Sequence, residues 1–322
     1  MKSQLPVLRL SSPEHRLSWA IPVLFEDEAL LVVEKPSGLL SVPDRYDPLR
    51  PNLVKLLHAG IAGGATWAKE RGLTYLSNAH RLDADTSGVF VFAKSKPVLV
   101  DLANQFGSGK PIKEYAALVH GVPDGATFRV DAAIAPHPAR PWIMRVDPRN
   151  GKKAVTDFEV VEAFEAHALL RCLPHTGRTH QIRVHLNSVR MPIVADELYQ
   201  GHPLLLSLLK QGYRLKPDRL ERPLIGRLAL HALRLTLTHP LTKEPVTFAS
   251  TMPKDMNVGL KYLRRYAPGY GQMGGVPAHD EPGTEGGAGL GMGIANQQAG
   301  AEAEAETESP QAGAGSEGDP GG

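Results

Sequence analysis

Between residues 23 and 250, apolar side chains occur mostly in short runs or in alternation with polar ones. Both patterns are typical of β-strands, because successive side chains of a strand point to opposite faces. Strands are predicted at residues 23–25, 29–34, 89–92, 113–119, 153–164, 168–173, 228–238 and 246–250. A turn at 35–38 followed by a short extended piece at 39–42 is also predicted.

Three segments instead predict helices, at residues 51–60, 96–106 and 178–189. In the last of these, Ile182, Leu186 and Val189 recur at intervals of three and four residues, as on one face of a helix. Residues 61–78 lack such a period and predict a loop. Because many strands follow one another with few helices between them, we expect an α+β fold with a central, largely antiparallel mixed sheet, flanked by helices and loops.

The last 56 residues differ from the rest of the chain. Residues 267–322 contain nine acidic residues, no Lys or Arg, and 16 of the 32 glycines. Such a composition cannot form an apolar core, so a disordered acidic tail rich in Gly, Ala and Glu is predicted. We therefore divide the chain into an N-terminal extension (1–22), a catalytic domain (23–266) and this tail.

Without the tail the chain is basic. The whole chain has a net charge of +2, but residues 1–266 hold 36 basic and 25 acidic residues, a formal balance of +11. This excess favours a polyanionic partner. No apolar run approaches the roughly 20 residues of a membrane-spanning helix, so no membrane partner is expected. A single cysteine, Cys172, excludes an internal disulfide and fits a reducing cytoplasm.

Candidate chemistry lies in three polar segments. Residues 80–88 hold Asp83 and Asp85 with a guanidinium, an imidazole and two hydroxyls, just before a predicted strand. A solvated surface loop is the simpler interpretation, although loops that enter a central strand often hold catalytic groups. Tyr115 lies in the strand at 113–119, where a core position is the alternative.

The third segment, residues 174–185, overlaps the helix predicted at 178–189 and would put Thr176 or Gly177 at the N-terminus of that helix. Free backbone N–H groups there would favour an anion. His180 and Arg183, three residues apart, would share a cationic face. An ordinary exposed helix face is the alternative.

Two other patterns carry no function. His175, His180 and His185 recur every five residues, which does not suit metal ligands on one helix face, so no metal site is predicted. The sequence at 107–110 is similar to a phosphate-binding loop, but Asn104 and Pro111 stand where that motif needs Gly and Ser or Thr.

Taken together, the segments resemble the RluA-type family of RNA pseudouridine synthases. The pattern HRLDxxTSG stands at 80–88, KxYxAxVxG at 113–121 and TGRTHQIRVHL at 176–186, and KPSGLLSVP precedes them at 35–43. The motifs occur in the family's order, and the resemblance extends from about residue 23 to residue 253. It implies the pseudouridine synthase fold for the catalytic domain.

The resemblance also implies roles for particular residues. Asp83, rather than Asp85, would be the essential carboxylate, Arg183 its partner, and Tyr115 the aromatic that packs against the target uracil. Arg81 would fill the space left by a flipped nucleotide. The complete set predicted to bind RNA or substrate is His80, Arg81, Thr86, Lys35, Lys113, Arg178, His180 and Gln181.

The reaction implied is the isomerisation of uridine to pseudouridine, which needs neither cofactor nor metal because no electrons or atoms are exchanged. A carboxylate can attack ribose C1′ or take a proton from C2′, and the residues do not decide between these routes. We expect a cytoplasmic monomer that acts on structured RNA, with ribosomal RNA favoured and tRNA next. The alternatives are a noncatalytic RNA-binding protein of the same fold and a hydrolase that uses Asp85 as a second carboxylate.

Overall fold

A computed structural model describes residues 6–45, 47–215 and 219–269 of the chain. Its strands are β1 (Val7–Ser12), β2 (Leu17–Glu26), β3 (Leu30–Lys35), β4 (Ser77–Asn78), β5 (Ser87–Ala93), β6 (Ile112–His120), β7 (Thr127–Asp131), β8 (Ile134–Pro136), β9 (Met144–Val146), β10 (Val155–Ala163), β11 (His167–Pro174), β12 (Leu230–Thr238) and β13 (Pro245–Ala249). The helices are α1 (Leu53–Ala62), α2 (Thr66–Glu70), α3 (Lys96–Gly107), α4 (Gln181–Ser188), α5 (Leu206–Leu209) and α6 (Lys254–Tyr266). Short 3-10 turns, η1 (Pro13–His15) and η2 (Glu197–Tyr199), complete the set.

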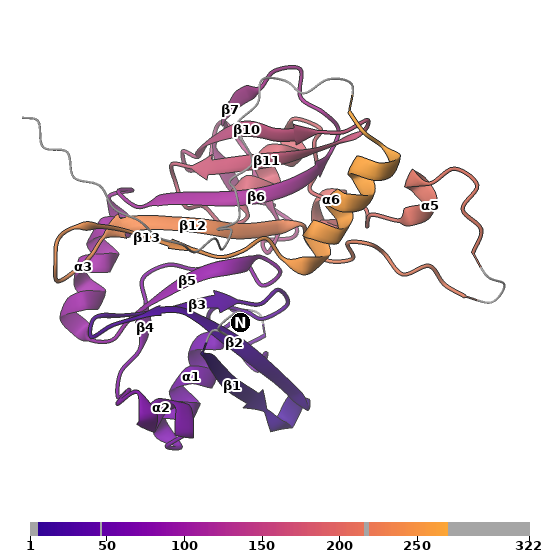
Figure 1. Cartoon of the computed structure of the whole chain (residues 1–322). Helices are drawn as coiled ribbons and strands as arrows, with labels where there is room; N and C mark the ends of the chain where they lie inside the picture. The colour runs from indigo at the N-terminus through magenta and orange to yellow at the C-terminus, as the bar shows by residue number, and fades with distance from the viewer. Residues whose placement is uncertain (1–5, 46, 216–218, 270–322) are drawn as a thin grey trace, which may run out of the picture. The chain divides into compact units, whose positions relative to one another are not determined.

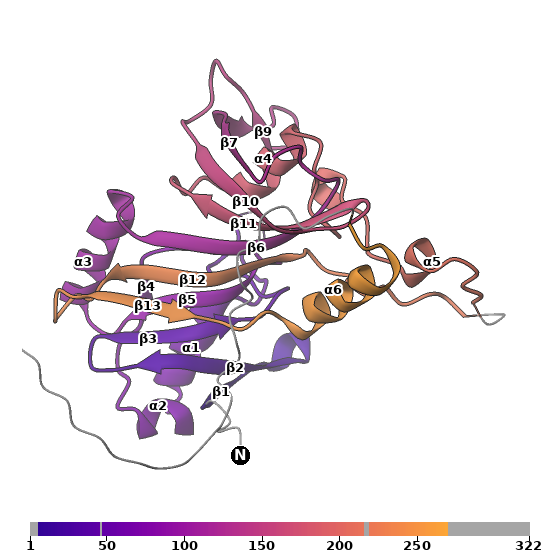
Figure 2. The same cartoon turned by 45° about the horizontal axis from the view of Figure 1, so that its top comes forward.

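Eleven of the described strands form one sheet (Figures 1 and 2). Its order is β1-β2-β3-β5-β12-β6-β11-β10-β7, with β13 paired to β12 and β4 to β5. Within the described residues, β5 and β12 form the one parallel pair, and the other pairings are antiparallel. The predicted α+β class and largely antiparallel sheet are confirmed.

The first half of the sheet is buried on both faces. In β3, Leu31 and Val33 pack on one side with α1 and α2, while Leu30 and Val32 pack on the other with α3 and β13. This explains why the strand is a continuous apolar run instead of an alternating one. In Figure 1, α1 and α2 accordingly lie beside β1 and β2. A further core lies between the second half of the sheet and the helices α4 and α6.

The predicted boundaries at both ends differ from the structure. The boundary between residues 22 and 23 falls inside β2, and residues 7–12 pair with β2 as an edge strand whose Leu8 and Leu10 are buried. At the other end, Ala267 is buried and accepts a hydrogen bond from the Glu165 N–H. The folded unit therefore begins before residue 23 and continues past residue 266. The predicted disorder of the tail concerns residues 270–322, which lie outside the described residues.

Three local predictions were wrong. The predicted loop at 61–78 contains α2, which buries Trp67, and the two-residue strand β4. Segments this short show no periodicity that could reveal them. The predicted extended piece at 39–42 bends at Leu39, Ser41 and Val42, and Leu40 forms an isolated bridge to Asn52. The third helix begins at Gln181, so Thr176 and Gly177 are not at a helix end.

Helix α4 is also not a surface helix. Its residues from Gln181 to Leu186 are all buried, which contradicts the alternative of an ordinary exposed helix face. Of the apolar set predicted to face the core, Val189 is exposed. No helix among the described residues is long and apolar enough to cross a membrane. Within that same part of the chain, no His, Cys, Asp and Glu side chains form a group of three that could hold a metal ion.

Candidate active site

The loop that holds Asp83 lies between β4 and β5 and is supported by the segment at 35–43. Ser41 Oγ donates to the Leu82 carbonyl at 2.7 Å and accepts from the Leu82 N–H at 3.1 Å. The Gly38 N–H donates to the Ala84 carbonyl at 3.0 Å. This segment therefore fixes the backbone on both sides of Asp83, which explains why KPSGLLS accompanies the Asp83 motif.

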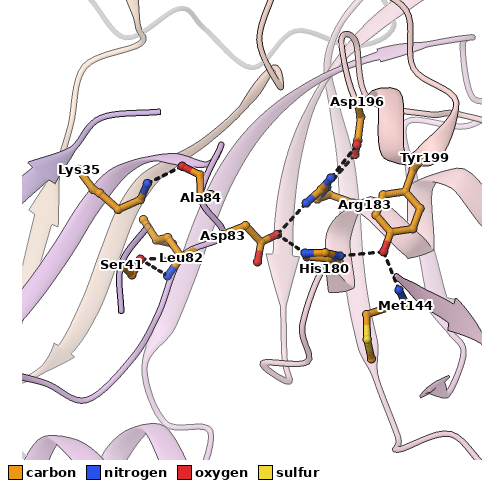
Figure 3. A network of polar contacts seen from close by, with 10 residues as sticks. All are labelled: Lys35, Ser41, Leu82, Asp83, Ala84, Met144, His180, Arg183, Asp196 and Tyr199. Carbon is orange, nitrogen blue, oxygen red and sulfur yellow. Dashed lines mark hydrogen bonds and ion pairs between the residues drawn. The ribbon is translucent and has the colours of Figure 1, made fainter. Parts of the chain in front are cut away.

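Lys35 is the centre of this support (Figure 3). Its side chain is fully buried, and its ammonium donates to the carbonyls of Pro36, Leu39 and Ala84 at 2.7–2.8 Å. Burial lowers the pKa of Lys35 to about 7, against the opposing charges of Asp85 and Asp83. Buried in this way, Lys35 cannot contact RNA, so its predicted binding role is replaced by a structural one.

Replacing Lys35 by methionine is expected to lower the free energy of unfolding by about 2 kcal/mol, because three carbonyls lose their donor. The folded-state pKa lies below the unfolded value of 10.5, so between about pH 7 and 10.5 the unfolded chain binds more protons. Wild-type stability should therefore rise with pH across this window, and Lys35→Met should lose that rise. Urea unfolding at pH 7 and pH 9.5 measures both effects.

The matched control is Lys94→Met, which removes a lysine bonded to Glu26 and the Asp27 carbonyl. It should leave turnover unchanged, whereas Lys35→Met should lower it through the loosened Asp83 loop. An equal pH trend in wild type and Lys35→Met would contradict the assignment.

The loop ends at Gly88, whose place explains the glycine of the motif. Gly88 has a φ of +116° and pairs with Ala232 at the parallel junction of β5 and β12. A Cβ here would collide with the Ala232 backbone. The close approach requires glycine and sets the point from which the Asp83 loop leaves the sheet.

The Asp83 carboxylate faces two cationic or polar side chains from the α4 region. Arg183 Nη1 lies 3.4 Å from Asp83 Oδ2, and His180 Nε2 lies 4.0 Å from the same oxygen. The Asp83 side chain is 17% exposed, so it remains open to a ligand. Asp83 and Arg183 thus lie together as predicted, although their contact is long for a hydrogen bond.

Arg183 has a second carboxylate partner, Asp196, which the sequence did not reveal. Arg183 Nε and Nη2 donate to the two Asp196 oxygens at 2.8 and 2.7 Å, a bidentate pair. The Asp196 side chain is 1% exposed. Burial by itself would lower the pKa of Arg183, but Asp196, and then Asp83, raise it above its ordinary value. Asp196 therefore holds Arg183 charged and oriented, and the remaining nitrogen points at Asp83.

Tyr199 completes the network (Figure 3). Its hydroxyl lies 2.8 Å from His180 Nδ1 and accepts from the Met144 N–H at 2.9 Å, and the Arg183 guanidinium lies 5.0 Å from its ring centroid. Asp196 and Tyr199 lie at the two ends of the turn that includes η2. They follow Arg183 in the sequence by thirteen and sixteen residues, respectively. No periodicity or motif spacing in the sequence could connect that turn with Arg183.

A cleft of about 660 Å³ opens beside Asp83. It is lined by every predicted site residue except Lys35: His80, Arg81, Asp83, Thr86, Lys113, Tyr115, Arg178, His180, Gln181 and Arg183. A second hollow of about 840 Å³ shares Arg81, Asp83, His180 and Arg183 with it, so the Asp83 loop lies between two cavities.

Several lining residues hold the cleft in shape. His80 stacks between Phe90 and Phe106 and accepts from the Val91 N–H, and burial, with the charge of Lys113, lowers the pKa of His80 to about 3. The buried Gln181 donates to the Val155 carbonyl and to Thr156 Oγ1, and it accepts from Thr176 Oγ1 and the Arg178 N–H. These contacts give His80 and Gln181 structural roles at the cleft, and their binding roles stay predictions.

Other lining residues stay open to a ligand. Arg81 and Arg178 are exposed, and Lys113 is half-buried, with its ammonium 3.2 Å from the Thr176 carbonyl. Thr86, by contrast, is buried, and its N–H donates a hydrogen bond to the Asp83 carbonyl at 3.2 Å.

Tyr115 is half-buried and packs against two apolar cores, the one that includes α4 and α6 and the one that includes α1 and α2. Burial, and then the charge of Asp83, raise the pKa of Tyr115 above its ordinary value. The phenol therefore stays neutral, as suits a surface for stacking.

Comparisons with known proteins identify the family. The model of the RNA pseudouridylate synthase family matches residues 29–188. The chain is 39% identical over 247 residues to ribosomal large subunit pseudouridine synthase D of Xylella fastidiosa, covering 76% of this chain and 70% of that protein. It is 36% identical over 232 residues to dual-specificity RNA pseudouridine synthase RluA of Salmonella typhi, covering 71% and 92%. The solved structure of human RNA pseudouridylate synthase domain containing 4 superposes with a TM-score of 0.57 at 25% identity, covering 75% of this chain and 92% of that one.

The fold and these relatives define an isomerase that makes pseudouridine in RNA. The chain belongs to the RluA-type family of RNA pseudouridine synthases.

Proposed function

We propose that this enzyme isomerises uridines of ribosomal RNA, with Asp83 as the carboxylate that acts on the ribose. The observation that carries the proposal is the position of the Asp83 carboxylate, partly exposed at a basic cleft and faced by Arg183 and His180. An ionised carboxylate held by a guanidinium suits attack on C1′ or removal of the C2′ proton.

The chemistry needs no external reactant. The bond from ribose C1′ to uracil N1 breaks, the base turns, and C1′ joins uracil C5. The C5 proton is lost and N1 gains a proton, so atoms and electrons balance. Asp83 is the one carboxylate among the described lining residues of the first cleft, which favours it over a two-carboxylate hydrolase.

The cleft suits a nucleotide taken out of its stack. Arg81, Lys113 and Arg178 supply positive charge for the phosphates, and Tyr115 supplies an aromatic surface. Extrusion of a base costs a few kcal/mol. Stacking on an aromatic side chain returns about 1–3 kcal/mol. Arg81 lines both cavities, which supports its proposed role of filling the vacated space.

The names of the relatives support ribosomal RNA as the substrate. Synthase D is named for the large ribosomal subunit, and RluA for dual specificity. We infer tRNA as the second candidate. We also infer a cytoplasmic monomer. The single cysteine, Cys172, cannot form an internal disulfide, which fits a reducing compartment.

The test is to incubate the full-length protein with unmodified ribosomal RNA and with a tRNA pool, and then to map pseudouridine at nucleotide resolution. New signals are expected in ribosomal RNA with wild type and none with Asp83→Asn. Signals in tRNA alone would refute the substrate assignment. Folded protein that binds both RNAs and modifies neither would favour the noncatalytic alternative.

A further inference from the structure

The hydrogen bonds around Tyr199 determine where the proton of His180 resides. The Met144 N–H can only donate, so the Tyr199 oxygen accepts there. Among the described residues, the other polar atom within hydrogen-bond distance of this oxygen is His180 Nδ1. We therefore assign the phenol proton to the hydrogen bond with Nδ1, which then accepts it.

The environment of His180 keeps its imidazole neutral. Burial lowers the pKa of His180, Arg183 and Arg81 lower it further, and Asp83 and Asp196 oppose the shift. A neutral imidazole carries one N–H. With Nδ1 as the acceptor, that proton is on Nε2, the nitrogen that faces Asp83 Oδ2 at 4.0 Å (Figure 3).

The two donors near Asp83 converge on one oxygen. Arg183 Nη1 and His180 Nε2 both face Oδ2, whereas Oδ1 makes no hydrogen bond to any described residue. The carboxylate is thus held through Oδ2, and Oδ1 is the oxygen without a described hydrogen-bond partner on a side chain that lines the cleft. Long contacts of this kind in a ligand-free site commonly shorten when substrate binds.

We propose that His180 is a positioning residue, held by Tyr199 in the tautomer with the proton on Nε2, and that it and Arg183 hold Asp83 Oδ2 so that Oδ1 is the oxygen that acts on the ribose. The inference rests on the proposed function of Asp83. It adds to that function a role for His180 and Tyr199 and a distinction between the two oxygens.

The backbone conformation of His180 fits this role. His180 has a φ of +54° immediately before α4, in the left-handed region that is uncommon for residues other than glycine, although His, Asn and Asp adopt it more often than the rest. Such strain persists where the surroundings enforce it and is common at functional sites. Here it turns the ring toward Tyr199 and Asp83 at the start of the helix that carries Arg183.

The test combines Tyr199→Phe with His180→Gln. Phenylalanine keeps the ring beside Arg183 and removes only the hydroxyl. The amide nitrogen of glutamine reaches the place of Nε2 and donates there without help from Tyr199. We expect Tyr199→Phe to lower the single-turnover rate about 10- to 100-fold, the range for partners that orient a functional group, with RNA affinity within about twofold. In the His180→Gln background the same change should alter the rate less than about twofold.

A purely structural role of Tyr199 predicts the same loss in both backgrounds, and that result would overturn the proposal. Tyr262→Phe on α6, whose ring stacks on Tyr266, is the matched control and should be neutral. The tautomer itself can be read from imidazole ¹⁵N signals in labelled protein, assigned by their loss in His180→Gln. A protonated Nδ1 at pH 7 would also overturn it.

The same assays separate this inference from the proposed function. Activity in Asp83→Asn would refute the role of Asp83 whatever Tyr199 does. An inactive Asp83→Asn together with a fully active Tyr199→Phe would refute only the role of Tyr199 and His180.

Discussion

Asp83→Asn is expected to lower the single-turnover rate by at least about 10³-fold, within the range for loss of a positioned base or nucleophile. The amide has the size of the carboxylate but neither attacks C1′ nor takes the C2′ proton. The fold should persist, because the main partner of Arg183 is Asp196. RNA affinity should stay within about threefold of wild type, since the basic residues of the cleft are unchanged. Rapid quench with excess enzyme measures the rate, and filter binding measures affinity.

Asp85→Asn is the matched control, because Asp85 is exposed two residues further along the same loop. Its rate should stay within about twofold of wild type. Comparable losses in both variants would mean that the charge of the loop, and not the carboxylate of Asp83, supports the reaction. A large loss in Asp85→Asn alone would refute the choice of Asp83.

Asp196→Ala is expected to lower the free energy of unfolding by about 3–5 kcal/mol, the range for removing one partner of a buried ion pair. The Arg183 side chain is 6% exposed and the Asp196 side chain 1%, so water cannot replace the lost carboxylate. For a domain of this size the melting temperature should fall by about 10 °C. Calorimetry or urea unfolding measures the change.

The matched control for stability is Asp157→Ala. Asp157 pairs with Arg129 and His175, whose side chains are 62% and 53% exposed, so its loss should cost no more than about 1 kcal/mol. Equal destabilisation in the two variants would contradict the buried-pair assignment.

Activity should fall in Asp196→Ala even at temperatures where the protein stays folded. Without Asp196, the guanidinium is free to turn its bidentate edge toward Asp83 and rotate that carboxylate. The rate per folded molecule at 20 °C is the relevant measurement. An unchanged rate would show that Asp83 needs only the charge of Arg183 and not its orientation.

The strands and the Asp83 motif were predictable because their signals are local. β3 and β5 are continuous apolar runs, as expected of strands buried on both faces. Gly88, the last residue of the motif, packs against the backbone of Ala232 in β12. By contrast, α2 and β4 are too short to show a period, and β1 lies outside the resemblance. Those elements become ordered by packing Trp67 and Leu8 onto the same core as β3.

The sequence by itself determined the α+β class, because strand alternation is a property of neighbouring positions. Its motifs, through their resemblance to the family, indicated the reaction class and, except for Lys35, side chains that line the cleft. Only the tertiary structure decided how each side chain is used. Arg183 takes its bidentate contact from Asp196, Lys35 is enclosed by three carbonyls, and Tyr199 orients His180. Hydrogen bonding and burial depend on distances between segments far apart in the chain, and spacing along the sequence does not contain those distances.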